Sequence, residues 1–183
     1  MKQRLAKFIY FKLLGWQVDG HYKTFQNDIK KAVIIAVPHT SWHDFYIGVL
    51  VREVLGIKVN FIGKKELFMF PFGFFFKALG GIPADRQNHQ NKVEAIVKLF
   101  KENDTFRIAL APEGTRKKVD KWRTGFYYIA KAAKVPVVMF TLDFKNKRNT
   151  FSKPFYPTEN VECDFKILEG FFKDVKGKIP KYS

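Results

Sequence analysis

Residues 32–44 read AVIIAVPHTSWHD, and this stretch decides the fold. Its first six residues form an unbroken apolar run rich in β-branched side chains, which is typical of a strand buried on both faces of a parallel sheet. Pro38 ends the run, and apolar residues at 45, 46, 49, 50 and 54 then recur at the spacing of a helix over residues 42–55. A buried strand that leads directly into a helix indicates an α/β fold.

The same alternation of short apolar runs and helical segments continues along the chain, without repeats or a linker rich in Pro, Gly or Ser. We therefore predict one α/β domain over residues 1–183, with a mixed, mostly parallel sheet flanked by helices. The further strands are expected at residues 58–62, near 82, 106–111, 135–144 and, as an edge strand, 150–156. The further helices are expected at residues 64–79, broken in two by Pro71 and Gly73, and at 89–101, 125–134 and 162–176.

The charge of the chain is unbalanced, with 33 Lys and Arg against 17 Asp and Glu, a formal net charge of +16. A fold does not need this excess, so it indicates general solubility or an anionic partner: nucleic acid, a membrane surface or a phosphorylated substrate. Cys163 is the only cysteine, which excludes a disulfide within the chain.

The first 20 residues mix lysines with aromatic and aliphatic side chains and show no cleavage site of a secretory signal. No window approaches the roughly 20 apolar residues that a membrane-spanning helix needs. We expect residues 1–20 to form a helix that lies in a membrane interface or packs on the domain. Residues 67–79, LFMFPFGFFFKAL, hold six Phe in thirteen residues, so they are expected to pack in the core, line an acyl tunnel or enter a membrane interface.

The chemistry is expected at His39, which directly follows the buried strand, where α/β folds place their sites. Asp44 falls in the first turn of the next helix, so its carboxylate can return to the imidazole and leave the other ring nitrogen to accept a proton. Two alternatives stay open. Ser41 and Asp44 also have the spacing of a helix-capping pair. His39 and His43 are spaced like two zinc ligands, although Thr40 stands where such a motif has Glu.

Cationic residues follow at two further places. Lys64 and Lys65 begin a helical segment after the second predicted strand, and Arg86 closes the segment GIPADR at residues 81–86. Such groups can face a phosphate or a developing oxyanion, and Arg can hold phosphate with two hydrogen bonds. The alternative is a solvated start of a helix.

The segment Pro112-Glu113-Gly114-Thr115-Arg116 comes directly after the predicted strand 106–111. Gly114 permits a tight turn of the backbone. If this strand runs parallel to the first one, the turn presents Glu113 and Arg116 at the same sheet edge as His39. Taken alone, the segment is also compatible with an ordinary charged loop.

Four blocks in order, H-x₄-D at 39–44, GKKEL…PxG…DR at 63–86, PEGTR at 112–116 and VPV at 135–137, resemble the glycerolipid acyltransferase family. Its best-known members are the lysophosphatidic acid acyltransferases, and the resemblance spans residues 32–138. It implies an enzyme of phospholipid biosynthesis that moves a fatty acyl group from an acyl thioester, on acyl carrier protein or coenzyme A, to a lysophospholipid hydroxyl. The acceptor that it implies is 1-acylglycerol-3-phosphate, with no metal and no cofactor.

The resemblance also implies roles for single residues. His39 is the general base and Asp44 orients it, while Lys64 and Lys65 stabilise charge near the thioester. The segment around Pro136 shapes the site. The implied substrate-binding residues of the later blocks are Arg86 and Arg116 for the acceptor phosphate, Glu113 for acceptor positioning, and Gly114 and Thr115 beside them.

A family member without a spanning helix is expected to attach peripherally to an anionic membrane, at the cytoplasmic face of the cell membrane. The alternative within the same chemistry is another lysolipid acceptor, such as an acylated amino acid. The alternatives of another class are a non-catalytic basic domain that binds membranes or nucleic acid. No recognised nucleic-acid-binding motif is present, so we expect no nucleic acid partner.

Overall fold

A computed structural model of the chain describes residues 2–84 and 89–183, and in them seven strands form one sheet. The sheet order is β1-β7-β6-β2-β5-β3-β4. The five strands from β6 to β4 are mutually parallel, whereas β7 is antiparallel to β6 and carries β1 parallel to itself. This confirms the mixed, mostly parallel sheet. The strands are β1 (Gln17–Gly20), β2 (Lys31–Val37), β3 (Asn60–Lys64), β4 (Gly81–Ala84), β5 (Phe106–Leu110), β6 (Val137–Thr141) and β7 (Arg148–Phe151).

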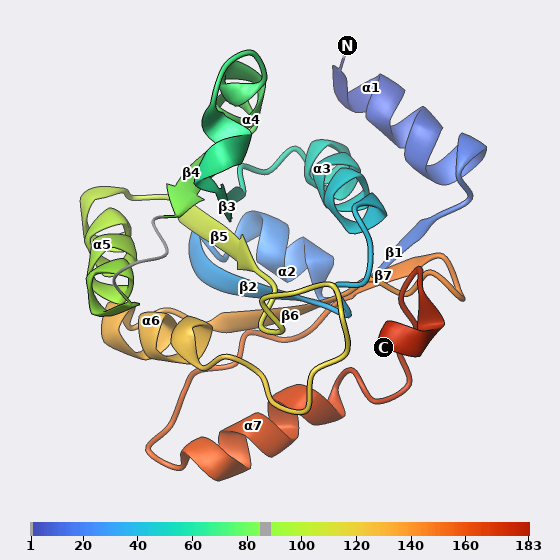
Figure 1. Ribbon diagram of the computed structural model, residues 1–183. Helices are drawn as coiled ribbons and strands as arrows, with labels where there is room; N and C mark the ends of the chain where they lie inside the picture. The colour runs from blue at the N-terminus through green and yellow to red at the C-terminus, as the bar shows by residue number, and fades with distance from the viewer. Residues whose placement is uncertain (1, 85–88) are drawn as a thin grey trace.

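Helices cover both faces of the sheet (Figure 1). Val33 and Ile35 of the central strand β2 are buried on one face, against α5 (His89–Glu102), α6 (Gly125–Ala133) and α7 (Val161–Gly170). Ala32 and Ile34 are buried on the other. That face is covered by α1 (Lys2–Lys7) with its π-helical continuation η1 (Phe8–Leu13), by α2 (Tyr22–Asn27) and by α3 (His43–Leu55). Since both faces of β2 are covered, its apolar run is continuous rather than alternating.

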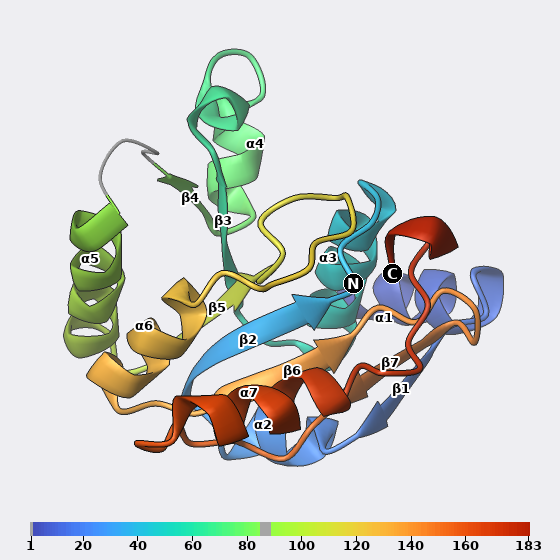
Figure 2. The same cartoon turned by 60° about the horizontal axis from the view of Figure 1, so that its bottom comes forward.

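Two short helices, η2 (Lys65–Phe68) and α4 (Gly73–Ala78), connect β3 to β4 and project beyond the ends of these strands (Figure 2). The predicted break of residues 64–79 into two helices is confirmed. The last short helix is η3 (Pro180–Tyr182) near the C-terminus. In the described ranges, no helix combines the length and apolar character needed to cross a bilayer.

The edge of the sheet formed by β1 and β7 differs from the prediction. The segment 150–156 was expected at an edge, but β7 lies between β1 and β6 and ends at Phe151. The edge is β1, which lies within the predicted helix 1–20, so that helix ends at Leu13. The four residues of β1 are mostly exposed and carry no apolar pattern, because an edge strand this short buries little. The predicted helix 162–176 also ends early, at Gly170.

The N-terminal helix is fixed to the domain through a few buried contacts. The Tyr10 hydroxyl donates to Asn149 Oδ1 at 2.7 Å, and Gln3 donates to the backbone oxygen of Val54 in α3 at 3.1 Å. Burial raises the pKa of the Tyr10 hydroxyl. Other apolar side chains of the same helix, including Leu5 and Phe8, remain exposed. The segment thus packs on the domain along one side and leaves apolar side chains on the other.

Candidate active site

The predicted site lies at the edge where the parallel strands end. β2 pairs with β5, and β5 pairs with β3, all in parallel, so their carboxyl ends open at the same edge of the sheet. His39 lies two residues beyond β2, and Glu113 lies three residues beyond β5. Residues 74 positions apart in the chain therefore meet at this edge, where open α/β sheets bind their ligands.

His39 and Asp44 are in direct contact. His39 Nδ1 lies 2.9 Å from Asp44 Oδ2, with the aspartate side chain 2% exposed and the histidine side chain 25% exposed. The carboxylate holds the proton on Nδ1, so Nε2 is the ring atom that can accept a proton from a substrate. The pair has the geometry of an oriented general base.

Asp44 also binds the turn that precedes its helix. Its Oδ2 accepts hydrogen bonds from the backbone N–H groups of Thr40 and Ser41, both at 2.8 Å. One oxygen of Asp44 therefore both contacts the imidazole and holds the turn before α3. The alternative of a Ser41–Asp44 capping pair is not borne out, because the N-cap residue of α3 is Trp42 and no side chain makes a capping hydrogen bond there. Its other oxygen, Oδ1, is buried and has no hydrogen-bond partner within the described part of the chain.

His43 has a different environment from His39. Its Nδ1 lies 2.8 Å from the Ser41 hydroxyl, and its ring lies beside that of Trp42, with centroids 4.2 Å apart and the planes tilted by 34°. Among residues 2–84 and 89–183, no group of three His, Cys, Asp or Glu side chains is arranged to hold a metal ion.

Glu113 connects the loop after β5 to the turn that carries His39. Its Oε1 accepts a hydrogen bond from the backbone N–H of His39 at 2.9 Å. Burial raises the pKa of the Glu113 carboxyl, while the backbone N–H and the charge of His39 act in the opposite direction. The residue thus fixes the position of the His39 backbone, in addition to the role that the family resemblance implies.

The loop that carries Glu113 is closed on itself. Gly114 has φ +64°, a left-handed conformation that glycine adopts without strain, and a Cβ there would lie 2.5 Å from Arg123 Nε. Arg123 also donates its backbone N–H to the oxygen of Pro112 at 2.9 Å. Within this loop Thr115 is half-buried and Arg116 is exposed.

Of the predicted cations, two lysines lie at the carboxyl end of β3, which opens at this edge. Lys64 ends β3 and Lys65 begins η2, both exposed. Arg86 lies outside the described residues. The segment around Pro136 is at the wrong end of the sheet for the role that the resemblance implied. Val137 pairs with Val33 in parallel register, so Pro136 lies at the amino end of β6, about 20 Å along the strands from His39.

One further neighbour of the site, the C-terminal segment, was not predicted from the sequence. Thr40 is 2% exposed, and its Oγ1 accepts a hydrogen bond from the backbone N–H of Ile179 at 3.2 Å. A Cβ on Gly177 would lie 2.6 Å from the same Oγ1. These partners are 139 positions apart, and no local pattern predicts a pairing at that separation.

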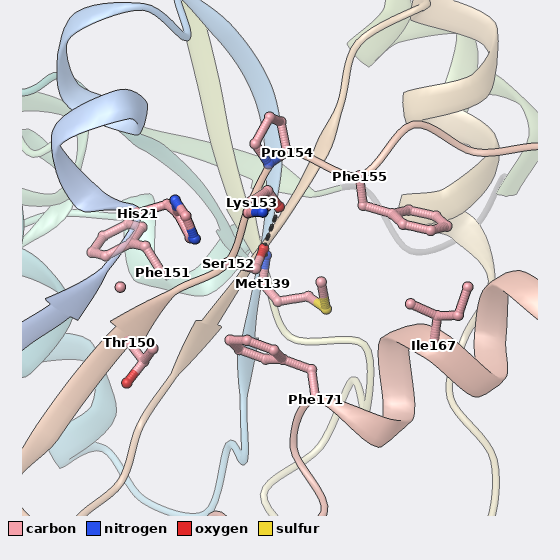
Figure 3. Close-up of a pocket in the computed structure, with 11 residues that line it drawn as sticks. His21, Met139, Thr150, Phe151, Ser152, Lys153, Pro154, Phe155, Ile167 and Phe171 are labelled. Atoms are coloured by element: carbon pink, nitrogen blue, oxygen red, sulfur yellow. Dashed lines mark hydrogen bonds between the residues drawn. The ribbon is translucent and has the colours of Figure 1, made fainter.

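A cavity of about 470 Å³ lies away from this site, between β7 and α7 (Figure 3). Met139, Phe171 and Ile167 line it together with His21 and the segment after β7. None of the predicted site residues is among its lining residues. The chemistry of the chain is therefore assigned from the open edge at His39 and not from this cavity.

Comparisons with known proteins agree with the fold. The sequence model of the family described as Acyltransferase matches residues 18–142, more than half of the chain. The crystal structure of the 1-acyl-sn-glycerophosphate (LPA) acyltransferase, PlsC, from Thermotoga maritima matches with a TM-score of 0.61 at 20% identity. That match covers 93% of this chain and 75% of the other, and at this identity it shows a shared fold. No curated protein sequence gives a significant match.

Proposed function

Because this chain belongs to the acyltransferase family, we propose that it moves a fatty acyl group from a thioester to the hydroxyl of a lysophospholipid, with 1-acylglycerol-3-phosphate as the acceptor. The observation that carries the proposal is the contact of 2.9 Å between His39 Nδ1 and the buried Asp44 carboxylate at the open sheet edge. A base held in this way removes a proton from an alcohol, which is the step that acyl transfer to a hydroxyl requires.

In the proposed reaction, His39 Nε2 takes the proton of the acceptor hydroxyl while its oxygen attacks the thioester carbonyl. A carbon–oxygen bond forms and a tetrahedral oxyanion results. When the oxyanion collapses, the carbon–sulfur bond breaks, and the thiol leaves with the proton that His39 carried. General base catalysis of this kind contributes about 10²–10⁴ in rate. The route needs no acyl-enzyme and no cofactor.

The charged residues around the edge have proposed roles in binding. Arg116, together with Arg86, binds the acceptor phosphate, and Lys64 and Lys65 stabilise charge near the thioester. Glu113 positions the acceptor. Its hydrogen bond to the His39 backbone supports this role, since it holds the base and the loop of Arg116 in a fixed relation.

We propose that the reaction takes place peripherally at the cytoplasmic face of an anionic membrane, where the lysophospholipid resides. The net charge of +16 supports this location, because each basic residue near an anionic leaflet contributes about 1 kcal/mol. The donor is acyl carrier protein or coenzyme A carrying the acyl thioester.

The test is acyl transfer by the purified protein, measured by mass spectrometry of the lipid product. Each donor is combined with 1-acylglycerol-3-phosphate, with lysophosphatidylcholine and with an acylated amino acid. His39→Ala is expected to lower kcat by at least about 10²-fold without changing the melting temperature by more than a few degrees. His21→Ala, remote from Asp44, is the matched control. Turnover of His39→Ala close to that of the wild-type protein would contradict the mechanism.

A further inference from the structure

The segment that connects β3 to β4 has two distinct faces. We call residues 65–79, which contain η2 and α4, the aromatic arm. Its inner face holds Phe68 and Phe76, which pack on one another with ring centroids 6.4 Å apart. A Cβ at either Gly63 or Gly81 of the adjoining strands would touch the Phe68 ring. The inner face therefore packs against the strands and fixes the arm to the sheet.

The outer face consists of exposed apolar side chains. Phe70 is 98% exposed and Phe74 is 85% exposed, far more than a core or a closed tunnel allows. The other large apolar residues exposed on the arm are Leu67 41%, Met69 64%, Phe72 68% and Phe75 57%. A monomeric soluble protein rarely exposes a continuous apolar patch of this kind without a partner for it.

The arm is a folded element and not a frayed loop. The backbone N–H of Gly73 donates to the oxygen of Met69 at 2.8 Å, and a side chain on Gly73 would overlap the backbone oxygen of Phe68. Gly73 is buried although both of its neighbours are exposed. The outer side chains are thus carried by a fixed segment, whose backbone projects beyond the rest of the fold (Figure 2).

The charges beside the aromatic arm favour one kind of partner. Lys64 and Lys65 lie at its base and Lys77 lies in α4. Glu66 is the single carboxylate within residues 64–79, so the lysines outnumber it. Exposed aromatic rings bordered by lysines are typical of elements that lie in the interface of an anionic bilayer. An acidic protein partner would use the lysines but would leave most of the rings without a matching surface.

We propose that the aromatic arm inserts its outer rings into the headgroup region of an anionic phospholipid bilayer and thereby turns the His39 edge of the sheet toward the lipid. The arm also contacts the helix that carries Asp44, because the ring centroid of Phe76 lies 5.9 Å from that of Phe45, the residue that follows Asp44. The orientation of the His39 edge toward the lipid rests on the proposed function. The insertion itself is measured without any turnover.

The first test compares binding to vesicles of phosphatidylglycerol and phosphatidylcholine by sedimentation. The full chain carrying Phe70→Ser and Phe74→Ser is expected to bind mixed anionic vesicles at least about tenfold more weakly than the wild-type protein. The control carries Tyr156→Ser and Ile167→Ser, which remove two large side chains that are 59% and 55% exposed outside the arm. Binding of the arm variant within twofold of the wild-type protein overturns the proposal, as does an equal loss in the control.

The second test places an environment-sensitive fluorophore on the arm. Cys163 is the only cysteine and is exposed on α7, so the labelled wild-type protein is the control. The test protein carries Phe70→Cys and Cys163→Ser with the same label. Anionic vesicles are expected to shift the emission of the label at position 70 to shorter wavelength and to leave the label at Cys163 unchanged. No shift at position 70, or equal shifts at both positions, overturns the proposal.

A third measurement separates this inference from the proposed function. Acyl transfer to a short-chain acceptor, dissolved below its micelle concentration and without vesicles, should be the same in the arm variant and the wild-type protein. Loss of this activity in the variant would mean that the arm holds substrate, and would overturn the insertion. Absence of transfer in the wild-type protein would count against the chemistry, while vesicle binding would still decide the role of the arm.

Discussion

Three hydrogen bonds converge on one carboxylate oxygen of Asp44: one from the His39 ring and two from the backbone N–H groups of Thr40 and Ser41. The backbone bonds set the shape of the turn, and in the proposed reaction the charge favours the imidazolium that forms when His39 accepts a proton. These two contributions can be separated, because an asparagine oxygen can accept the same three hydrogen bonds without carrying a charge.

Asp44→Asn is expected to lower kcat by about 10²–10⁴ while changing the stability of the fold only slightly. Asp44→Ala removes the acceptor altogether and leaves buried N–H groups of Thr40 and Ser41 unpaired, each at a cost of about 1–3 kcal/mol. Urea denaturation of both variants beside steady-state kinetics distinguishes the two contributions. Equal loss of stability in both variants would mean that the charge, and not the hydrogen-bond geometry, holds the turn.

Glu113 gives a prediction of pH dependence. Burial raises the pKa of its carboxyl above the ordinary value of about 4.3, so the folded protein binds this proton more tightly than the unfolded chain does. The stability contributed by this group is therefore greatest at acid pH and is lost as the pH rises through the raised pKa. Glutamine keeps an oxygen acceptor for the His39 N–H but carries no charge.

Glu113→Gln is expected to melt at about the same temperature as the wild-type protein near pH 4 and a few degrees higher near pH 7.5, since about 1 kcal/mol shifts a protein of this size by roughly 2–4 °C. Thermal melts over this pH range provide the measurement. Glu169→Gln, exposed on α7, serves as the control and should show no such divergence. A Glu113→Gln protein that loses stability relative to wild type as the pH rises would refute the assignment.

At the scale of single elements, the buried strands and helices were the ones that the sequence predicted best. β2 and α3 could be predicted almost to the residue, because a strand covered on both faces reads as a continuous apolar run and an amphipathic helix repeats with its own period. β1 and α2 were missed, because each is short and owes its structure to neighbours far away in the chain. Gln17 of β1, for example, pairs with Arg148 of β7. The His39 and Glu113 turns were predictable because each directly follows a buried parallel strand.

The C-terminal segment offers a test of how one element holds another. A Cβ on Gly177 would lie 2.6 Å from Thr40 Oγ1 and 2.7 Å from its Cγ2, so Gly177→Ala forces this contact apart and strains the turn that carries His39. We expect kcat to fall about tenfold or more, because small displacements of a catalytic group have large effects on rate, with a stability loss of about 1–3 kcal/mol. The control is Gly170→Ala at the end of α7, where an added Cβ meets no atom within 4 Å of the described structure. Unchanged kcat in Gly177→Ala would show that the segment does not position the catalytic turn.

At the scale of the whole molecule, the fold and the general placement of the site could be predicted from the sequence, but the faces that it shows to other molecules could not. The Phe-rich stretch 67–79 was compatible with a core, a tunnel or an interface, because composition does not tell which rings have neighbours. Only the three-dimensional packing separates Phe76, held against Phe45, from Phe70, which is 98% exposed. The exposed rings of this stretch also help to decide which anionic partner the net positive charge serves.

The charge of +16 alone is compatible with a nucleic acid or an anionic membrane, and salt dependence separates the two. Binding to DNA depends on the release of counterions and falls by about 10³–10⁵ between 50 and 200 mM salt when several phosphates are contacted. Binding to a bilayer also includes burial of apolar side chains, which salt does not screen. We therefore expect the protein to remain on anionic vesicles at 0.5 M salt and the variant carrying Phe70→Ser and Phe74→Ser to be released there, as measured by sedimentation. Duplex DNA, supplied at the same concentration of negative charge as the vesicles, should retain neither protein at this salt concentration. Retention of the wild-type protein on DNA but not on vesicles would assign the charge to a nucleic acid partner.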